Sequence, residues 1–183
     1  MKSYTTRSEM ISYATSMLAE DRREIRRAAE NSSATGATFL SHSSRDDELV
    51  DGAIRILRNH GAKVYIDKVD PSMPPYTTKK TASLLKDRIN QTKKFVLLAT
   101  KNSVNSNWVP WELGIADGRK GLSNIAIFPT VEERHQTTWT KSEYLGLYRR
   151  IIWGGIEGYD KPMWIVLDEE ENTASPLRRW IQS

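Results

Sequence analysis

Short apolar strands alternate with amphipathic helices along most of this 183-residue chain, and this alternation restricts the possible folds more than any other feature. The expected strands are residues 37–40, 63–67, 95–99, 124–129 and 163–167. Between them apolar residues recur with helical spacing, as in Leu49, Ala53 and Leu57. Short, almost wholly apolar strands joined by helices are typical of a parallel sheet that is covered on both faces. We therefore expect an α/β fold with a five-stranded parallel sheet and helices on both faces.

Right-handed crossovers leave few topologies for such a sheet, and the flavodoxin-like order 2-1-3-4-5 is the most economical. In that order the first and third strands are neighbours, and the switch point lies between them. Ligands of open α/β sheets bind at such a point, beyond the carboxyl ends of the strands. The loop 41–46, the turn 108–112 and the loop 67–75 should therefore meet at one crevice.

Three segments lie outside the regular alternation of strands and helices. Residues 8–31 have the spacing of one helix, and a small polar linker follows at residues 31–36. We expect residues 1–33 to form a helical extension that packs on the domain or on a partner, and residues 34–183 to form the domain itself. Residues 130–162 give a weaker pattern, with a helix expected around residues 141–150, and the chain closes in a short helix at 176–181.

The turn Trp108-Val109-Pro110-Trp111-Glu112 carries the clearest chemical signal. Pro110 suits a first helical turn, where its missing N–H would have no partner in any case. Glu112 then lies near the positive end of the helix dipole, and Trp108, four residues earlier, shares its face. A carboxylate beside an indole at a strand's carboxyl end suits a ligand site. The plainer alternative is a helix start whose Glu only complements the dipole.

Composition excludes several classes of function. The chain has no cysteine and only three widely separated histidines, so neither a thiolate site nor a histidine metal site is expected. The net charge of +4 is modest, and basic residues do not alternate with exposed aromatics as in a nucleic-acid groove. No apolar run approaches the ~20 residues that span a bilayer, and no secretion signal is evident. We expect a soluble, cytoplasmic protein with neither membrane nor nucleic-acid partners.

Three motifs together resemble the Toll/interleukin receptor (TIR) domain family. They are Phe39-Leu40-Ser41-His42-Ser43-Ser44-Arg45-Asp46, the strand end Tyr65-Ile66-Asp67, and Ser106-Asn107-Trp108-Val109-Pro110-Trp111-Glu112-Leu113. The resemblance covers roughly residues 36–129 in order and spacing. Prokaryotic and plant-type members cleave the nicotinamide–ribose bond of NAD+, which is a substrate and not a cofactor. In that family the catalytic acid ends a Trp-x-x-x-Glu pattern, so the resemblance implies that Glu112 is catalytic.

The resemblance also implies a set of substrate-binding residues around Glu112. They are Phe39, Ser41, His42, Ser43, Arg45, Asp67 and Trp108. Several have plainer alternatives: Trp108 could seal the helix onto the sheet, His42 could bond within its loop, Asp67 could form an Asx-turn and Arg45 could be an exposed helix-start residue. Asp46 is expected to cap the next helix. The loop Asp67–Pro75 resembles the family's BB loop, although it lacks the usual Gly.

The partners implied are NAD+, further TIR domains through self-association, and a separate effector that is reached through the nucleotide product. A free-standing TIR domain resembles the anti-phage Thoeris layout of prokaryotes. The product could be ADP-ribose, a cyclic isomer or a conjugate. Two other functions stay open at this point: a non-catalytic TIR adaptor and an enzyme resembling nucleoside 2-deoxyribosyltransferases, which also use a Glu in ribose chemistry.

Overall fold

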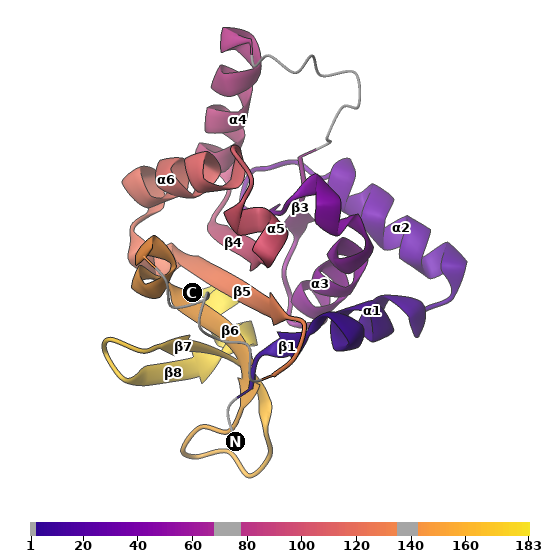
Figure 1. Cartoon of the computed structure of the whole chain (residues 1–183), viewed down its shortest axis with the longest axis vertical. Coiled ribbons are helices and arrows are strands. Elements are labelled where there is room, and N and C mark those ends of the chain that lie inside the picture. Colours follow the sequence, from indigo (N-terminus) through magenta and orange to yellow (C-terminus); the bar gives the residue numbers. More distant parts are fainter. Residues whose placement is uncertain (1–2, 68–77, 135–142) are drawn as a thin grey trace.

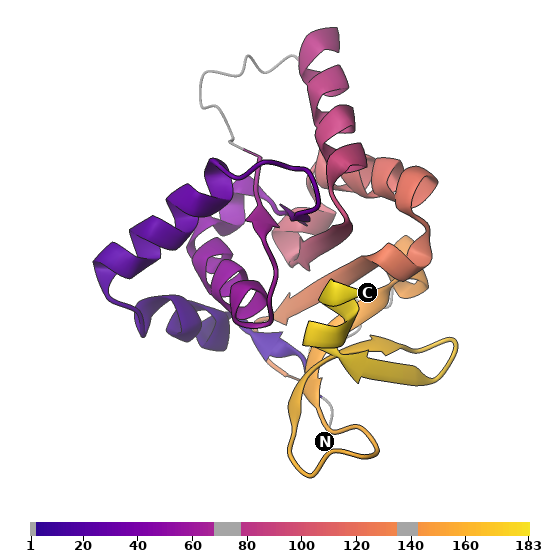
Figure 2. The same cartoon turned by 180° about the vertical axis from the view of Figure 1, so that it is seen from behind.

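The computed structural model describes residues 3–67, 78–134 and 143–183. Within these ranges it has a central sheet flanked by helices (Figures 1 and 2). The strands are β1 (Thr5–Thr6), β2 (Thr38–Ser41), β3 (Val64–Tyr65), β4 (Lys94–Ala99), β5 (Ile125–Val131), β6 (Arg149–Gly154), β7 (Met163–Asp168) and β8 (Thr173–Pro176). The helices are α1 (Arg7–Thr15), α2 (Ala19–Glu30), α3 (Asp47–Asn59), α4 (Lys79–Gln91), α5 (Lys101–Val104), α6 (Val109–Lys120) and α7 (Leu177–Gln182).

The sheet is mostly parallel, and its strands lie in the order β3-β2-β4-β5-β6-β7-β8, with β1 paired to β5. Strands β3, β2, β4 and β5 are the first four expected strands in the order 2-1-3-4, all parallel. The expected five-strand order was wrong beyond that point. Strand β6 lies between β5 and β7, and both β7 and β8 run antiparallel to their neighbours. Over the described residues the sheet is therefore mixed and has eight strands.

The helix expected around residues 141–150 was also wrong where the structure describes that segment. Residues 143–147 form a 3₁₀ helix, and Arg149–Gly154 form β6. Ile151 and Ile152 are buried in neighbouring clusters on opposite faces of this strand. Arg150 is buried beside them and donates to the Tyr4 hydroxyl at 2.6 Å and to Glu169 at 2.8 Å. These partners lie far from Arg150 in the sequence and stabilise its charge inside the strand. The local sequence pattern therefore does not predict that residues 149–154 form a strand.

Two apolar clusters fill the opposite faces of the sheet, as the strand-helix alternation predicts. Side chains of β4 alternate between them: Val96 and Leu98 join one cluster, while Phe95 and Leu97 join the other. The first cluster packs against α3 and α7, and the second against α4 and α6. Figure 1 shows α1, α2 and α3 together on one side of the sheet and α4 with α6 on the other.

The N-terminal residues pack against the rest of the chain, but as two helices instead of the single helix expected over 8–31. Helix α1 ends at Thr15, where Arg55 of α3 donates to the Tyr13 carbonyl at 2.6 Å and so satisfies an end carbonyl. Met10 of α1 is fully buried against α3. Gly52 makes this approach possible, because a Cβ there would lie 2.2 Å from the Met10 carbonyl oxygen.

Among the described residues, no helix combines the length and apolar character needed to cross a membrane.

Candidate active site

A cavity of about 140 Å³ opens at the carboxyl ends of β2 and β4, where the topology predicts a ligand site. Six of the eight expected site residues line it. They are Phe39, Ser41, His42, Asp67, Trp108 and Glu112. These residues come from the end of β2, the segment after β3 and the start of α6. The convergence of the three motifs at one crevice therefore holds in the structure.

Glu112 lies in the first turn of α6, and its amide donates to the Trp108 carbonyl at 2.9 Å. Pro110 falls in this turn, as its missing N–H predicts. The Glu112 carboxyl is half-buried and accepts a hydrogen bond from the Ser41 hydroxyl at 2.5 Å. Burial raises the pKa of Glu112 to about 7; the nearby negative charge of Asp67 adds to this shift, whereas the Ser41 hydrogen bond opposes it. A carboxyl group near half-ionisation at neutral pH is suited to charge stabilisation and to proton transfer.

Trp108 immediately precedes α6, and its side chain is 38% exposed at the cavity. The Ser106 hydroxyl accepts from its backbone amide at 3.2 Å. Trp111 packs edge-on against it, with ring centroids 5.5 Å apart and planes at 82°. Trp111 belongs to the apolar cluster under α6 and does not line the cavity. An exposed indole braced by a partly buried one offers a fixed face for a flat or cationic ring.

Asp67 lies across the cavity in a pair of polar contacts. It forms an ion pair with Arg88 of α4, and the Tyr65 hydroxyl donates to it at 2.9 Å.

Two residues of the β2 motif complete this side of the cavity. Phe39 is almost fully buried and stacks on Phe95 with centroids 5.4 Å apart. His42 is half-buried, its Nδ1 lies 3.3 Å from the Leu40 carbonyl oxygen, and burial lowers its pKa. His42 is therefore mainly neutral at physiological pH and adds no positive charge to the cavity.

Ser43 and Arg45 do not line this cavity in the structure. Ser43 is buried and its hydroxyl accepts from the Arg45 amide at 3.3 Å, which starts a 3₁₀ turn over Ser44–Asp46. The Arg45 side chain is exposed. Any contact of these two residues with substrate remains a proposal from the family resemblance.

Asp46 occupies the N-cap position of α3, as expected, but its side chain makes no capping hydrogen bond. Its buried carboxylate instead accepts from the Thr100 hydroxyl at 2.5 Å and from the Asn102 amide at 2.7 Å. Arg7 of α1 approaches it to 3.5 Å. The carboxylate therefore joins the loop after β2 to the start of α5. These hydrogen bonds are strong, because their acceptor is charged.

Five further residues line the cavity, of which three lie within the motifs that the sequence analysis singled out and two do not. They are Leu40, Ser44, Thr81, Leu85 and Ser106. Thr81 and Leu85 lie on α4, whose position over the cavity depends on tertiary packing.

The charge of the cavity wall is negative. The described lining holds two carboxylates, Asp67 and Glu112, and no Lys or Arg. Such a lining suits a cationic group of a ligand better than a phosphate. Nearly all of the expected BB loop lies outside the described residues.

A family model for the TIR domain matches residues 38–159, which is more than half of the chain. The chain belongs to the TIR domain family. Its α/β sheet with helices on both faces agrees with that assignment. Family membership also removes the deoxyribosyltransferase alternative.

Two relatives are similar to this TIR domain over much of its length. A Bacillus cereus (strain MSX-D12) protein named "Probable 3' cyclic ADP-D-ribose synthase ThsB'" is 31% identical over 147 residues, which cover 79% of this chain and 74% of that protein. A Cytobacillus dafuensis protein named "Putative cyclic ADP-D-ribose synthase TIR2" is 32% identical over 118 residues, or 56% of this chain. The match with the second covers only 31% of that longer relative.

Proposed function

We propose that this chain cleaves the nicotinamide–ribose bond of NAD+ and closes the ADP-ribosyl group so released into a cyclic product. The observation that carries the proposal is the Glu112 carboxyl, held by Ser41 beside Trp108 in the cavity where the sheet topology favours ligand binding. The names of both relatives support the cyclic product, since each is called a cyclic ADP-D-ribose synthase. The name of the Bacillus cereus relative favours the 3′ cyclic isomer.

The first chemical step needs little from the protein beyond charge. The bond from ribose C1′ to the pyridinium nitrogen breaks, and its electron pair leaves with neutral nicotinamide, so no acid is required at the leaving group. Positive charge then develops on the ribose ring, as in glycoside cleavage generally. The Glu112 carboxylate stabilises that charge, and its attraction is stronger in a partly buried site than in water. The Trp108 face favours the pyridinium by cation–π attraction.

The second step needs a nucleophile and a base. For a cyclic product the nucleophile that attacks C1′ is a hydroxyl group of the same ADP-ribosyl cation, and for hydrolysis to ADP-ribose it is water. The hydroxyl that attacks C1′ loses a proton, and a carboxylate whose pKa is about 7 can accept it. Cavity walls that admit the ribose of the adenosine half and exclude water would favour the cyclic product.

The cavity is smaller than the ~300–1,000 Å³ of typical whole-ligand pockets, so it suits one end of the dinucleotide. We propose that self-association through TIR–TIR contacts completes the site for the remainder of NAD+. We also propose that the cyclic product acts on a separate effector in anti-phage defence, in agreement with the family resemblance. These proposals concern partners, and the chemistry at Glu112 stands independently of them.

Replacement of Glu112 by Gln tests the proposed chemistry. The amide retains the shape of the side chain but removes the negative charge. We expect release of nicotinamide from NAD+ to fall by about a thousandfold, a loss typical of one removed electrostatic contact in an active site. An unchanged thermal melting curve is the control for folding. An adaptor without catalytic activity would release no nicotinamide before or after the substitution.

A further inference from the structure

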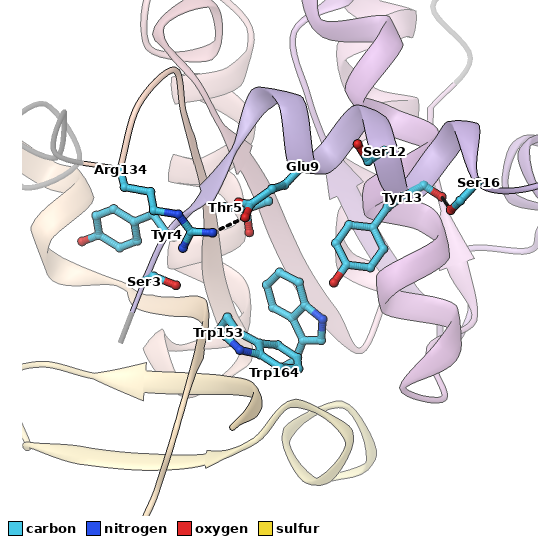
Figure 3. Close-up of a pocket in the computed structure, with 10 residues that line it drawn as sticks. All are labelled: Ser3, Tyr4, Thr5, Glu9, Ser12, Tyr13, Ser16, Arg134, Trp153 and Trp164. Carbon is cyan, nitrogen blue, oxygen red and sulfur yellow. Dashed lines mark hydrogen bonds and ion pairs between the residues drawn. The ribbon is translucent and has the colours of Figure 1, made fainter. Parts of the chain in front are cut away.

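A second cavity, of about 400 Å³, lies beneath α1 and shares no lining residue with the Glu112 cavity. Its walls come from the N-terminal segment, α1, the segment after β5 and the strands β6 and β7. Figure 3 shows the rings of Tyr4, Tyr13, Trp153 and Trp164 around this space, with Glu9 and Ser12 projecting from the helix above. Its volume lies within the ~300–1,000 Å³ that small-molecule sites usually occupy.

The aromatic walls are fixed before any ligand enters. Trp164 is buried and packs edge-on against Tyr13 and Trp153, with centroid separations of 6.0 and 5.6 Å. The Tyr4 hydroxyl accepts from buried Arg150 at 2.6 Å, which fixes the orientation of that ring. Trp153 is nevertheless 40% exposed. A ligand that stacks on these rings therefore pays little conformational entropy for ordering them.

The polar groups of the cavity indicate a ligand with hydrogen-bonding atoms. Several residues that carry hydroxyl groups, among them Ser3, Ser12 and Tyr13, line the cavity. A ligand with donor or acceptor atoms can form hydrogen bonds with such hydroxyl groups, whereas a purely hydrocarbon ring cannot. Arg134 at the mouth is paired with Glu9. The two charges cancel, and the mouth therefore gives no advantage to an anion or a cation.

From these features we propose that the cavity beneath α1 binds an uncharged nitrogen heterocycle of the nucleobase kind, as a free base or a nucleoside. The flat ring would stack on the indole and phenol faces, as bases do on aromatic platforms. A ring nitrogen or exocyclic group would bond to a hydroxyl group of the cavity wall, such as that of Tyr13 or Ser12. The site is separate from the proposed NAD+ cleavage and does not depend on it.

Adenosine titrated into the full chain in a calorimeter tests the assignment, with D-ribose as the probe that lacks an aromatic ring. We expect saturable adenosine binding and none for ribose.

Three substitutions test where adenosine binds. Trp153→Ala should weaken adenosine binding at least tenfold, in line with the loss of one stacking platform of about 1–3 kcal/mol. Ser12→Trp, on the exposed side of α1, should block the cavity without disturbing the core. Tyr159→Ala removes an exposed aromatic residue outside the cavity and should leave binding unchanged.

Trp108→Ala distinguishes this site from the Glu112 cavity, and adenosine binding should survive that substitution. Loss of binding in Trp108→Ala with full binding in Trp153→Ala would assign adenosine to the Glu112 cavity and overturn the proposal. No binding at millimolar adenosine would also overturn it. Full adenosine binding in both Trp153→Ala and Ser12→Trp would overturn the proposal as well, even if either substitution lowered the melting temperature.

Discussion

The carboxyl group of Glu112 is subject to opposing influences that lie far apart in the sequence. Burial and the Asp67 charge raise its pKa, and the Ser41 hydrogen bond lowers it, with the balance at about 7. Its place in a first helical turn beside Trp108 follows from local spacing and from Pro110. The Ser41 contact does not, because it joins residues 71 positions apart. The sequence therefore predicts the acid, whereas its pKa depends on the tertiary structure.

The pH dependence of kcat/KM for NAD+ follows from that pKa. Only the ionised carboxylate stabilises positive charge, so activity should fall as the pH decreases through about 7, by about tenfold per pH unit below it. In Ser41→Ala the midpoint should move to higher pH, because the lost hydrogen bond stabilises the charged form. Ser44→Ala should keep the midpoint, because Ser44 lines the cavity but does not contribute to the pKa of Glu112. A profile that stays flat down to about pH 4, where ordinary carboxyl groups titrate, would contradict this role.

The two indoles at the start of α6 should differ in their effect on turnover. Trp108 is exposed at the cavity, whereas Trp111 braces it from the apolar cluster. We expect Trp108→Ala to lower kcat/KM about tenfold, near the upper range of one cation–π contact, and Trp111→Ala to lower it less. Trp108→Phe should recover part of the loss. Steady-state kinetics on folded variants give the ranking, and the reverse order would show that Trp111 is the residue nearer the substrate.

At the scale of secondary structure, the sequence predicted an element well where the signal lies within the element itself. Strands β2, β4 and β5 are built around short apolar runs and are buried along their whole length, and α3 and α4 bury residues that helical spacing selects. Strand β6 was missed because it begins with Arg149 and Arg150, whose partners Asp168 and Glu169 lie beyond the next turn. The break between α1 and α2 was missed because it depends on packing against α3. Charged pairs and close approaches of this kind form only in the folded chain.

The packing of α1 on α3 depends on Gly52. A methyl group there would approach the Met10 carbonyl oxygen to 2.2 Å, so Gly52→Ala must displace one helix. We expect a loss of about 1–3 kcal/mol in the free energy of unfolding, as for overpacked cores. Gly118→Ala is the matched control, since nothing lies within 4 Å of its Cβ and alanine favours a helix. Urea unfolding midpoints measure both, and equal stability of Gly52→Ala and the unmodified chain would contradict the close contact.

For the molecule as a whole, the proposed function places one end of NAD+ in a small cavity and the remainder against a second copy. Specific activity should therefore rise with protein concentration over the range in which the chain associates, because dilution separates the copies by mass action. Sedimentation velocity at the same concentrations relates activity to association. A specific activity that is constant across a wide dilution series, with the chain monomeric throughout, would show that one copy holds a complete site.

The central claim is that the Glu112 cavity converts NAD+ into nicotinamide and a cyclic ADP-ribose. The most direct test is mass spectrometry of the products of a concentrated sample, with the Glu112→Gln variant as the blank. We predict equal amounts of nicotinamide and of a product whose mass is that of NAD+ less nicotinamide, with neither formed by the variant. ADP-ribose, heavier by one water, would instead show a hydrolase. Unchanged NAD+ in both samples, or full turnover by Glu112→Gln, would contradict the account.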